Sequence, residues 1–176
     1  MIILKNGRGQ LGEALCSELT NVKIIPTEEV FIYHTWDMDC DKNDNASHRE
    51  CFAKFKDFVH FNSKKKIFFI STYSSTHNSY NVYKQKCESY LSLYCDSGYS
   101  IRLPVLTGKG ICSKLKSDVA VPYGDIELMT HDAAAKGILD IVEEVIVRPI
   151  KDPTSGCYRL EGTKIPASLV QELVQQ

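Results

Sequence analysis

The chain has 176 residues, of which 24% are charged, and a formal net charge of -1. This length fits one domain, residues 1–176, with a substantial buried core. The balanced charge provides no basic field for nucleic acid, and no run is long and apolar enough to span a membrane. The start of the chain lacks the basic region and cleavage site of a signal peptide, so we expect a cytoplasmic protein with small-molecule partners.

No pattern for a metal site or a disulfide framework is present. The seven cysteines are odd in number and include no Cys-x-x-Cys pair, so we expect mostly reduced thiols in the core. Asp37, Asp39 and Asp41 have the alternating spacing that opens a calcium loop. Lys42 and His48 then stand where the loop needs glycine and a bidentate glutamate. We expect a solvated loop and no metal.

The first motif is glycine-rich. An apolar Ile2-Ile3-Leu4 run leads into Gly7-Arg8-Gly9-Gln10-Leu11-Gly12, and the leucines that follow have helical spacing. The order strand, glycine turn, helix is typical of a loop that holds a pyrophosphate, because glycines allow close approach and a helix N-terminus offers free N–H groups. The alternative is an ordinary tight turn between a strand and a helix.

Short strands and one helix are predicted next. Val22–Ile25 and Val30–His34 read as strands with little room for a helix between them. Phe52, Phe55 and Val59 mark one face of a helix that ends near Asn62. The continuous apolar run 67–70 is typical of a parallel strand buried on both faces.

The second half continues the alternation. We expect a helix over 80–94, a strand over 101–106 and a helix over 131–145, followed by short extended segments at 145–147 and 157–160. The tail from Pro166 reads as a helix with Leu169, Val170 and Leu173 turned inward. Strands that alternate with helices predict an α/β fold with an open, mostly parallel sheet covered on both faces.

A hydroxyl, a phenol and an amine form the candidate reactive group. Thr72 ends the strand over 67–70, and Tyr80 and Lys84 are four apart on the next helix, so they share one face. The Lys84 ammonium near the Tyr80 phenol would favour its ionised form, and such a tyrosine can exchange a proton with an alcohol or ketone. Thr72 could hydrogen-bond the same substrate oxygen.

Other readings of this segment remain open. Tyr80 and Lys84 could be a surface pair on an amphipathic helix. Tyr83 is a rival phenol, but four residues later it meets Cys87, which supplies no cation. Ser74 and Ser75 are alternative hydroxyls if the turn after the strand is tight.

In this order the motifs resemble the extended short-chain dehydrogenase/reductases, the family of nucleotide-sugar epimerases, dehydratases and reductases. The opening Ile3-Leu4-Lys5-Asn6-Gly7-Arg8-Gly9-Gln10-Leu11-Gly12 is most similar to dTDP-4-dehydrorhamnose reductases. The family's first glycine falls on Asn6, with Gly7 beside it. The segments 130–134 and 156–160 resemble the late helix start and final strand of the sugar-modifying members.

The resemblance implies roles for individual residues. Thr72 would orient the substrate carbonyl, Tyr80 would donate a proton to it, and Lys84 would lower the tyrosine pKa and hold the nicotinamide ribose. Glu88 fits a glutamate often found after that lysine. The implied cofactor is NAD or NADP, and the residues implied to bind it are Gly7, Arg8, Gly9, Gln10, Leu11, Gly12, Thr35, Lys84 and Pro104.

The resemblance also implies a Rossmann-like, doubly wound sheet that is truncated on the adenosine side. About 1–107 would form the cofactor-binding core, and about 108–176 a minimal C-terminal substrate lobe. Glu28 and Glu29 are candidates to reach an adenosine ribose and Arg8 is a candidate for a 2'-phosphate, so the choice between NAD and NADP stays open.

The implied function is an NAD(P)-dependent oxidoreductase or epimerase for a nucleotide-linked keto sugar, with 4-keto reduction preferred. The alternative is a non-catalytic dinucleotide-binding regulator or assembly subunit with the same fold. Family members often pair through helices, so the resemblance also implies a homodimer that includes the helix with Tyr80.

Overall fold

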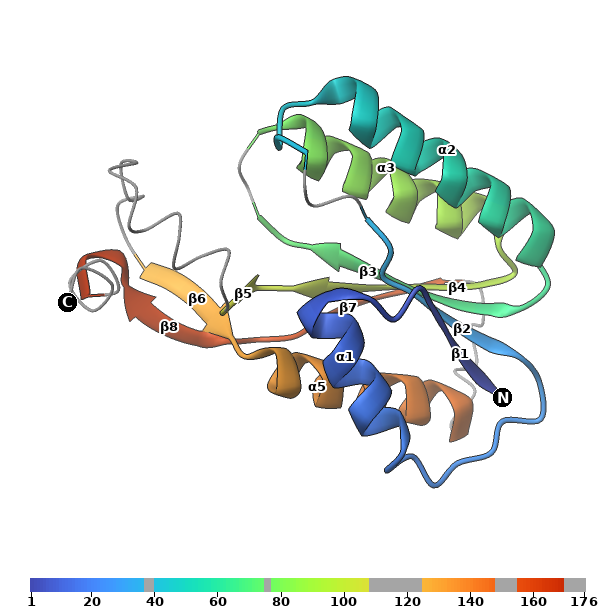
Figure 1. The fold of residues 1–176 in the computed structure, drawn as a ribbon. Coiled ribbons are helices and arrows are strands. Elements are labelled where there is room, and N and C mark those ends of the chain that lie inside the picture. Colours follow the sequence, from blue (N-terminus) through green and yellow to red (C-terminus); the bar gives the residue numbers. More distant parts are fainter. Residues whose placement is uncertain (37–39, 75–76, 108–124, 148–154, 170–176) are drawn as a thin grey trace.

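A parallel sheet forms the centre of the computed structural model, which describes residues 1–36, 40–74, 77–107, 125–147 and 155–169 (Figure 1). Apolar β-branched and aromatic residues fill its strands, as the pleated and buried surface favours. Its five strands lie in the order β1 (Ile2–Lys5), β2 (Val30–Tyr33), β3 (Lys66–Thr72), β4 (Ser97–Leu103) and β7 (Ser155–Arg159), and every neighbouring pair is parallel.

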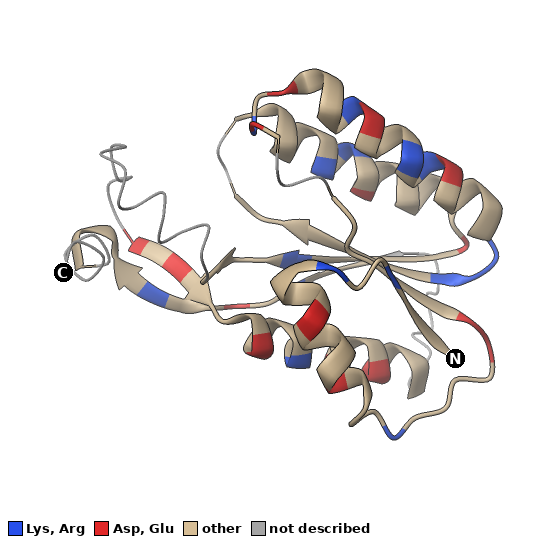
Figure 2. Cartoon of the chain, in the orientation of Figure 1, with Lys and Arg blue, Asp and Glu red and all other residues tan. Residues whose placement is uncertain are grey.

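Helices cover both faces of this sheet, as the sequence predicts for a doubly wound fold. α1 (Gly9–Leu19) and α5 (His131–Val147) pack together on one face, and α2 (Asn45–Asn62) and α3 (Ser79–Tyr94) on the other (Figure 1). Charged residues occur on all four of these helices (Figure 2). No described helix is long and apolar enough to cross a membrane.

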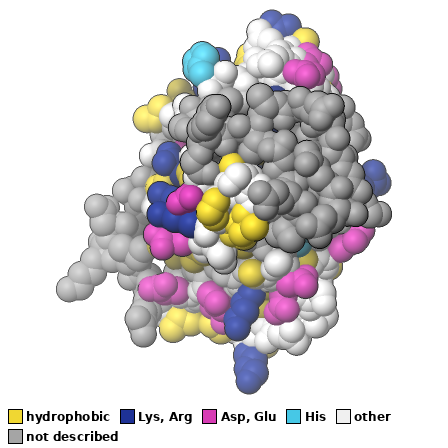
Figure 3. All heavy atoms as spheres, turned by 90° about the vertical axis from the view of Figure 1, so that its left-hand side faces the viewer, with side chains coloured by type: hydrophobic (Ala, Val, Ile, Leu, Met, Phe, Trp, Pro, Cys, Tyr) yellow, Lys and Arg dark blue, Asp and Glu magenta, His cyan; other side chains and the backbone are white. Residues whose placement is uncertain are grey.

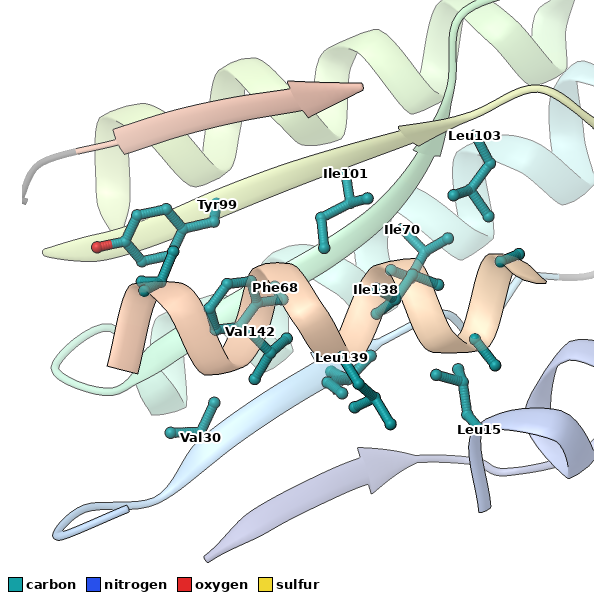
Figure 4. Close-up of a cluster of buried hydrophobic side chains, with 14 of the residues drawn as sticks. Leu15, Val30, Phe68, Ile70, Tyr99, Ile101, Leu103, Ile138, Leu139 and Val142 are labelled. Carbon is teal, nitrogen blue, oxygen red and sulfur yellow. The ribbon is translucent and has the colours of Figure 1, made fainter. Parts of the chain in front are cut away.

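Two hydrophobic clusters hold the layers to the sheet. Phe68 and Ile70 of β3 point into a cluster with Leu15 of α1 and Ile138 of α5 (Figure 4). Their neighbours Ile67 and Phe69 point into the other cluster, between the sheet and α2 and α3. The alternation follows from the two-residue period of a strand, so the continuous apolar run serves both faces.

The first strand lies at the edge of the sheet. β1 pairs only with β2 among the described strands, although α1 lies on the opposite face from α2 and α3. Each step β1 to β2 and β2 to β3 moves the same way across the sheet, so these two crossovers have opposite hands. Crossovers between parallel strands are almost always right-handed, so one of these two is of the rare left-handed kind. The loss of strands and helices that would extend the sheet beyond β1 would explain it. β1 is an edge strand of the described sheet, which fits the truncation on the adenosine side that the resemblance implied.

A small second sheet was not predicted. β5 (Val105–Leu106), β6 (Asp125–Met129) and β8 (Thr163–Pro166) form it, with β6 parallel to β5 and antiparallel to β8. Gly162 makes the close contact before β8, since a Cβ there would lie 2.4 Å from the backbone oxygen of Leu128. α5 and β7 return to the main sheet, so residues beyond 107 complete the central core as well as this small sheet.

Three local predictions were wrong. Val22–Ile25 is not a strand; Val22 packs against the core while Ile25 is 90% exposed, and the segment links α1 to β2. Residues 145–147 continue α5, because Val145 is a core position of that helix. Leu169 is 45% exposed and not turned inward; Val170 and Leu173 lie outside the described residues.

Candidate functional site

The predicted site residues gather at the carboxyl edge of the main sheet. Parallel strands end at one edge, and the loops after β1, β2, β3 and β4 carry the glycine loop, Thr35, Tyr73 and Pro104, respectively. Open parallel sheets bind ligands at this edge. Figure 3 views the molecule toward this edge and shows hydrophobic side chains next to basic and acidic ones.

Close packing explains two glycines of the loop after β1. A Cβ on Gly12 would lie 2.5 Å from the carbonyl carbon of Gly7, and one on Gly7 would lie 2.8 Å from Cys16 Sγ. Gly9 differs: its φ is 76° and nothing lies within 4 Å of the position of a Cβ. The loop is thus tight at its base and open at Gly9, as a site for a bulky anion requires.

The start of α1 lacks the side-chain cap that the other long helices have. Asp44 accepts from Ala46 N at 3.0 Å before α2, and Asn78 accepts from Asn81 N at 2.9 Å before α3. Thr130 Oγ1 accepts from Ala133 N at 3.1 Å in the first turn of α5. Arg8, the N-cap of α1, makes no such bond, and the first turn holds no acidic residue. Free N–H groups and a positive dipole end therefore face the open part of the loop, which fits a pyrophosphate.

Thr35 and Pro104 line the same edge on either side of β3. Thr35 Oγ1 donates to Lys5 O at 2.9 Å, which ties the end of β2 to the end of β1. Pro104 follows β4, and its Cγ lies 3.2 Å from where a Cβ on Gly162 would stand. Thr35 thus supports the base of the glycine loop, while Pro104 joins the main sheet to the small one.

Lys84 is buried below this edge in an aromatic cage. Its side chain is on α3 and only 4% of the residue is exposed. Nζ donates to Ile70 O at 2.9 Å and lies 4.6 Å from the ring centroid of Trp36 and 4.8 Å from that of Phe69. Burial lowers the pKa of Lys84 to about 8. Cation–π contact with desolvated rings offsets part of the cost of burial.

Tyr80 lies next to Lys84, but its predicted tuning is wrong. Lys84 Nζ is 5.7 Å from the Tyr80 ring centroid, so the two side chains share a face as the spacing predicted. Burial nevertheless raises the pKa of Tyr80 to about 12. The ring packs edge-on against Trp36 and His48, at centroid distances of 6.2 and 5.7 Å. Desolvation outweighs the lysine's influence, so the phenol stays protonated at neutral pH.

Thr72 ends β3 and is half-buried. Its Oγ1 accepts a hydrogen bond from Ser74 N at 3.3 Å, so the hydroxyl helps form the turn that follows the strand.

Tyr83, the rival phenol, is buried against Phe52 between α2 and α3, at a centroid distance of 5.9 Å. Ser75, the other alternative hydroxyl, lies outside the described residues.

Two polar atoms at this edge were missed by sequence reasoning. His34 Nε2 and Ser71 Oγ are buried and have no hydrogen-bond partner in the described part of the chain. Burial lowers the pKa of His34, opposed by the nearby Asn6 backbone and aided by Lys84, so the imidazole is neutral. Buried groups of this kind usually have partners, so both fit a site that takes a polar ligand.

An ion-pair network supports the β4 and β7 side of the site. Arg102 donates to both oxygens of Glu88, with Nη2 to Oε2 at 2.6 Å, and so joins β4 to α3. Arg159 binds Glu127 at 3.0 Å and stacks on the Tyr73 ring at 4.0 Å. Glu88, which the resemblance placed near the lysine, therefore anchors the helix that carries Lys84 and Tyr80.

The predicted ribose ligands are in the wrong place. Glu28 pairs with Lys66, and Glu29 pairs with Lys65 at 2.9 Å. Both glutamates precede β2 and so lie at the amino edge of the sheet, opposite the glycine loop. The prediction failed because Val22–Ile25 is not the strand that would have carried an acid to the carboxyl edge.

Solved structures share this fold, while at the sequence level no family model and no curated protein matches the chain. A dTDP-4-dehydrorhamnose reductase from Clostridium acetobutylicum is 12% identical with a TM-score of 0.57, over 98% of this chain and 78% of that one. The Bordetella bronchiseptica enzyme WbmH in complex with NAD+ is 11% identical with a TM-score of 0.67, over 97% and 78%. WbmG from the same organism, in complex with NAD and UDP, is 14% identical with a TM-score of 0.56, over 98% and 76%.

These identities are low, so the likeness is one of fold. The resemblance predicted from the motifs is confirmed at that level, because a dTDP-4-dehydrorhamnose reductase is among the matching structures. The chain has a Rossmann-like α/β fold, which it shares with these structures.

Proposed function

We propose that the protein is an NAD(P)-dependent oxidoreductase that acts on a nucleotide-linked keto sugar. The observation that carries the proposal is the contact between Lys84 and Tyr80, with 5.7 Å from Nζ to the ring centroid, on the helix that follows β3, in a fold whose first strand leads into the uncapped start of α1. The matching structures bound to NAD+ and to NAD with UDP support the cofactor and the substrate class. Reduction of a 4-keto group is the preferred reaction.

The loop and its neighbours would hold the cofactor. Gly7, Gly9 and Gly12 shape the loop, and the free N–H groups of α1 would bind its pyrophosphate. Arg8 adds a positive charge, and Gln10 and Leu11 contribute the first turn. Thr35, Pro104 and Lys84 would line the nicotinamide end. When bound, the cofactor supplies hydride chemistry; the binding residues accept either NAD or NADP.

The protonation of Tyr80 favours the reductive direction. A phenol with a pKa of about 12 holds its proton at neutral pH and can donate it to a carbonyl oxygen that gains charge. Thr72 Oγ1 would orient that carbonyl. Lys84 is mostly charged below pH 8 and would stabilise the phenolate that remains after donation.

Turnover with a panel of nucleotide keto sugars and NADH or NADPH tests this proposal. Tyr80→Phe should lower turnover by at least about 100-fold, the typical contribution of a general acid, and leave dinucleotide affinity within about twofold. Tyr83→Phe is the matched control, because this phenol lies on the same helix but packs between α2 and α3. Full activity in Tyr80→Phe would refute the assignment.

A second candidate is a dinucleotide-binding regulator or assembly subunit without turnover. The packing of the Tyr80 ring between Trp36 and His48 favours it, since the ring is held by neighbours that a substrate would not displace easily. The edge position of β1 also leaves the adenosine side narrow. Saturable dinucleotide binding with no reduction of any sugar in the panel would select this candidate over the enzyme.

We also propose a homodimer that pairs through α2 and α3. A groove beside these helices is lined by Phe52, Val82, Tyr90 and Leu93 together with polar Gln85, Lys86 and Ser89, and Leu93 is 75% exposed. A second copy that covers this groove would remove its apolar side chains from water. Sedimentation should give the mass of two chains, and Leu93→Asp should give one. A single-chain mass for the unmodified protein would contradict the dimer.

A further inference from the structure

We propose that His48 is a positioning residue for the site: it fixes the indole of Trp36, and through that ring it fixes the ammonium of Lys84. The consequence for turnover rests on the proposed function. The positioning itself does not, because it concerns contacts within the chain alone.

His48 is held at both ring nitrogens. The residue lies on the first turn of α2 and is 1% exposed. Its Nδ1 accepts from Trp36 Nε1 at 3.1 Å, and its Nε2 lies 3.1 Å from Asp41 O. An indole N–H only donates and a carbonyl only accepts, so the imidazole must be neutral with its proton on Nε2. The tautomer and the ring orientation are both set.

Trp36 carries this restraint to Lys84. The indole stacks on the His48 ring with 25° between the planes, and its own ring centroid is 4.6 Å from Lys84 Nζ. Trp36 follows β2 and Lys84 is on α3, so the contact joins two elements across the sheet edge. A free indole at the end of a strand could rotate away, whereas the bond to His48 prevents that rotation.

The ammonium depends on the ring faces around it. Among the described residues its hydrogen bond goes to Ile70 O, and the remaining directions face Trp36, Phe69 and Tyr80. A buried ammonium with few hydrogen-bond acceptors gains part of its stabilisation from such faces. Loss of the Trp36 face would therefore free Lys84 to move and to meet water.

Two variants test the roles of the two ring nitrogens of His48 separately. His48→Asn places a side-chain oxygen near the Nδ1 position and keeps the acceptor for Trp36. His48→Gln places its amide near the Nε2 position, which keeps the donor to Asp41 O but not the acceptor for Trp36. A purely structural role for the ring predicts similar losses in both, whereas positioning through Trp36 predicts that His48→Asn is close to the unmodified protein.

Two readouts need neither cofactor nor substrate. Trp36 is the only tryptophan in the chain, so its fluorescence reports on this cluster alone. We expect a red-shifted emission in His48→Gln and an unchanged one in His48→Asn. The rate of Lys84 acylation, followed by mass spectrometry, should rise about tenfold in His48→Gln, as loss of a desolvated ring face implies. It should stay within about twofold in His48→Asn.

A double-mutant cycle tests whether His48 acts on Lys84 through Trp36. Trp36→Leu should itself raise Lys84 acylation about tenfold, and His48→Gln in that background should add nothing, because coupled residues are not additive. If His48→Gln does not fold, Trp36→Leu and His48→Asn still test each half. Unchanged emission and acylation in His48→Gln, equal loss in His48→Asn, or a further rise in the double variant would each overturn the proposal.

Turnover separates this inference from the proposed function. His48→Gln should lower kcat about tenfold, and His48→Asn should restore it to within about threefold. If the protein binds no dinucleotide, the proposed function fails while the fluorescence and acylation results still decide the role of His48.

Discussion

The two helical layers bury different kinds of side chain. The cluster between the sheet and α1 and α5 is made of apolar residues, mostly aliphatic. All the buried polar residues of the described chain lie on the other side, toward α2 and α3: His48, Ser71, Asn81, Lys84 and Ser100. The layer of α1 and α5 therefore stabilises the fold without burying polar side chains. The layer of α2 and α3 contains buried polar groups, which a purely structural core would avoid.

Aromatic rings accompany those polar groups. Tyr33, Phe55 and Phe69 pack together below α2, and Phe69 also faces Lys84. Ring faces attract an ammonium while they exclude water. The aromatic composition of this layer suits the buried charge of Lys84, and the contrast with the aliphatic layer supports the proposal that the site lies on this side.

The largest effect is expected in the aliphatic layer. Ile138→Ala, at a fully buried position of α5, should lower the free energy of unfolding by about 2 to 5 kcal/mol because it leaves a cavity. Urea denaturation measures this loss. Dinucleotide affinity under native conditions should stay unchanged, since Ile138 is not among the residues proposed to bind the cofactor. We also expect a single transition, because we propose that residues 1–176 form one domain; two transitions would contradict that.

Lys84→Met should change the stability in the opposite direction. The pKa of Lys84 falls from 10.5 to about 8 on burial, which implies that the charge costs about 3 kcal/mol in the folded state. Removal of the charge should raise the free energy of unfolding by about 1 to 3 kcal/mol at pH 7 and abolish turnover. The folded state releases this proton first, so the stability contributed by Lys84 rises between pH 8 and 10.5. The difference in the free energy of unfolding between the unmodified protein and Lys84→Met should shrink over that pH range. A constant difference would contradict a buried charge at Lys84.

A smaller gain is expected at the glycine loop, which leads into α1 on the aliphatic side. Arg8 has the extended backbone of an N-cap but makes no cap bond, so Arg8→Asp should cap α1 and stabilise the fold by about 1 kcal/mol. The same carboxylate should weaken dinucleotide binding at least about tenfold, through occupied N–H groups and repulsion of the phosphates. Thermal unfolding and a binding titration measure the two effects. Equal affinity in Arg8→Asp would show that the loop is only a turn.

Regular elements were predictable because their signals are local. The apolar run at Ile67–Ile70, the spacing of α5 and the helix with Tyr80 and Lys84 follow from period and composition. β6 and β8 were not found, because Asp125–Met129 and Thr163–Pro166 are stabilised by pairing between segments far apart in the chain. The hydrophobic patterns of these two segments are short and combine apolar with charged residues.

The shared face of Tyr80 and Lys84 was predictable, whereas the electrostatics of the two side chains were not. The spacing placed Tyr80 and Lys84 on one face, and the structure agrees. The raised pKa of Tyr80 and the cage around Lys84 depend on Trp36 and His48, which come from other elements. His48 carries no local signal for such a role beyond its position in a helix that faces the sheet.

The central claim is that the carboxyl edge binds a nicotinamide dinucleotide. Trp36 stands at this edge and is the only tryptophan, so energy transfer from its indole to a reduced nicotinamide reports binding there. Titration with NADH and NADPH should quench Trp36 emission in a saturable way for at least one of them, with a matching rise in nicotinamide emission. No saturable transfer with either dinucleotide would contradict the claim.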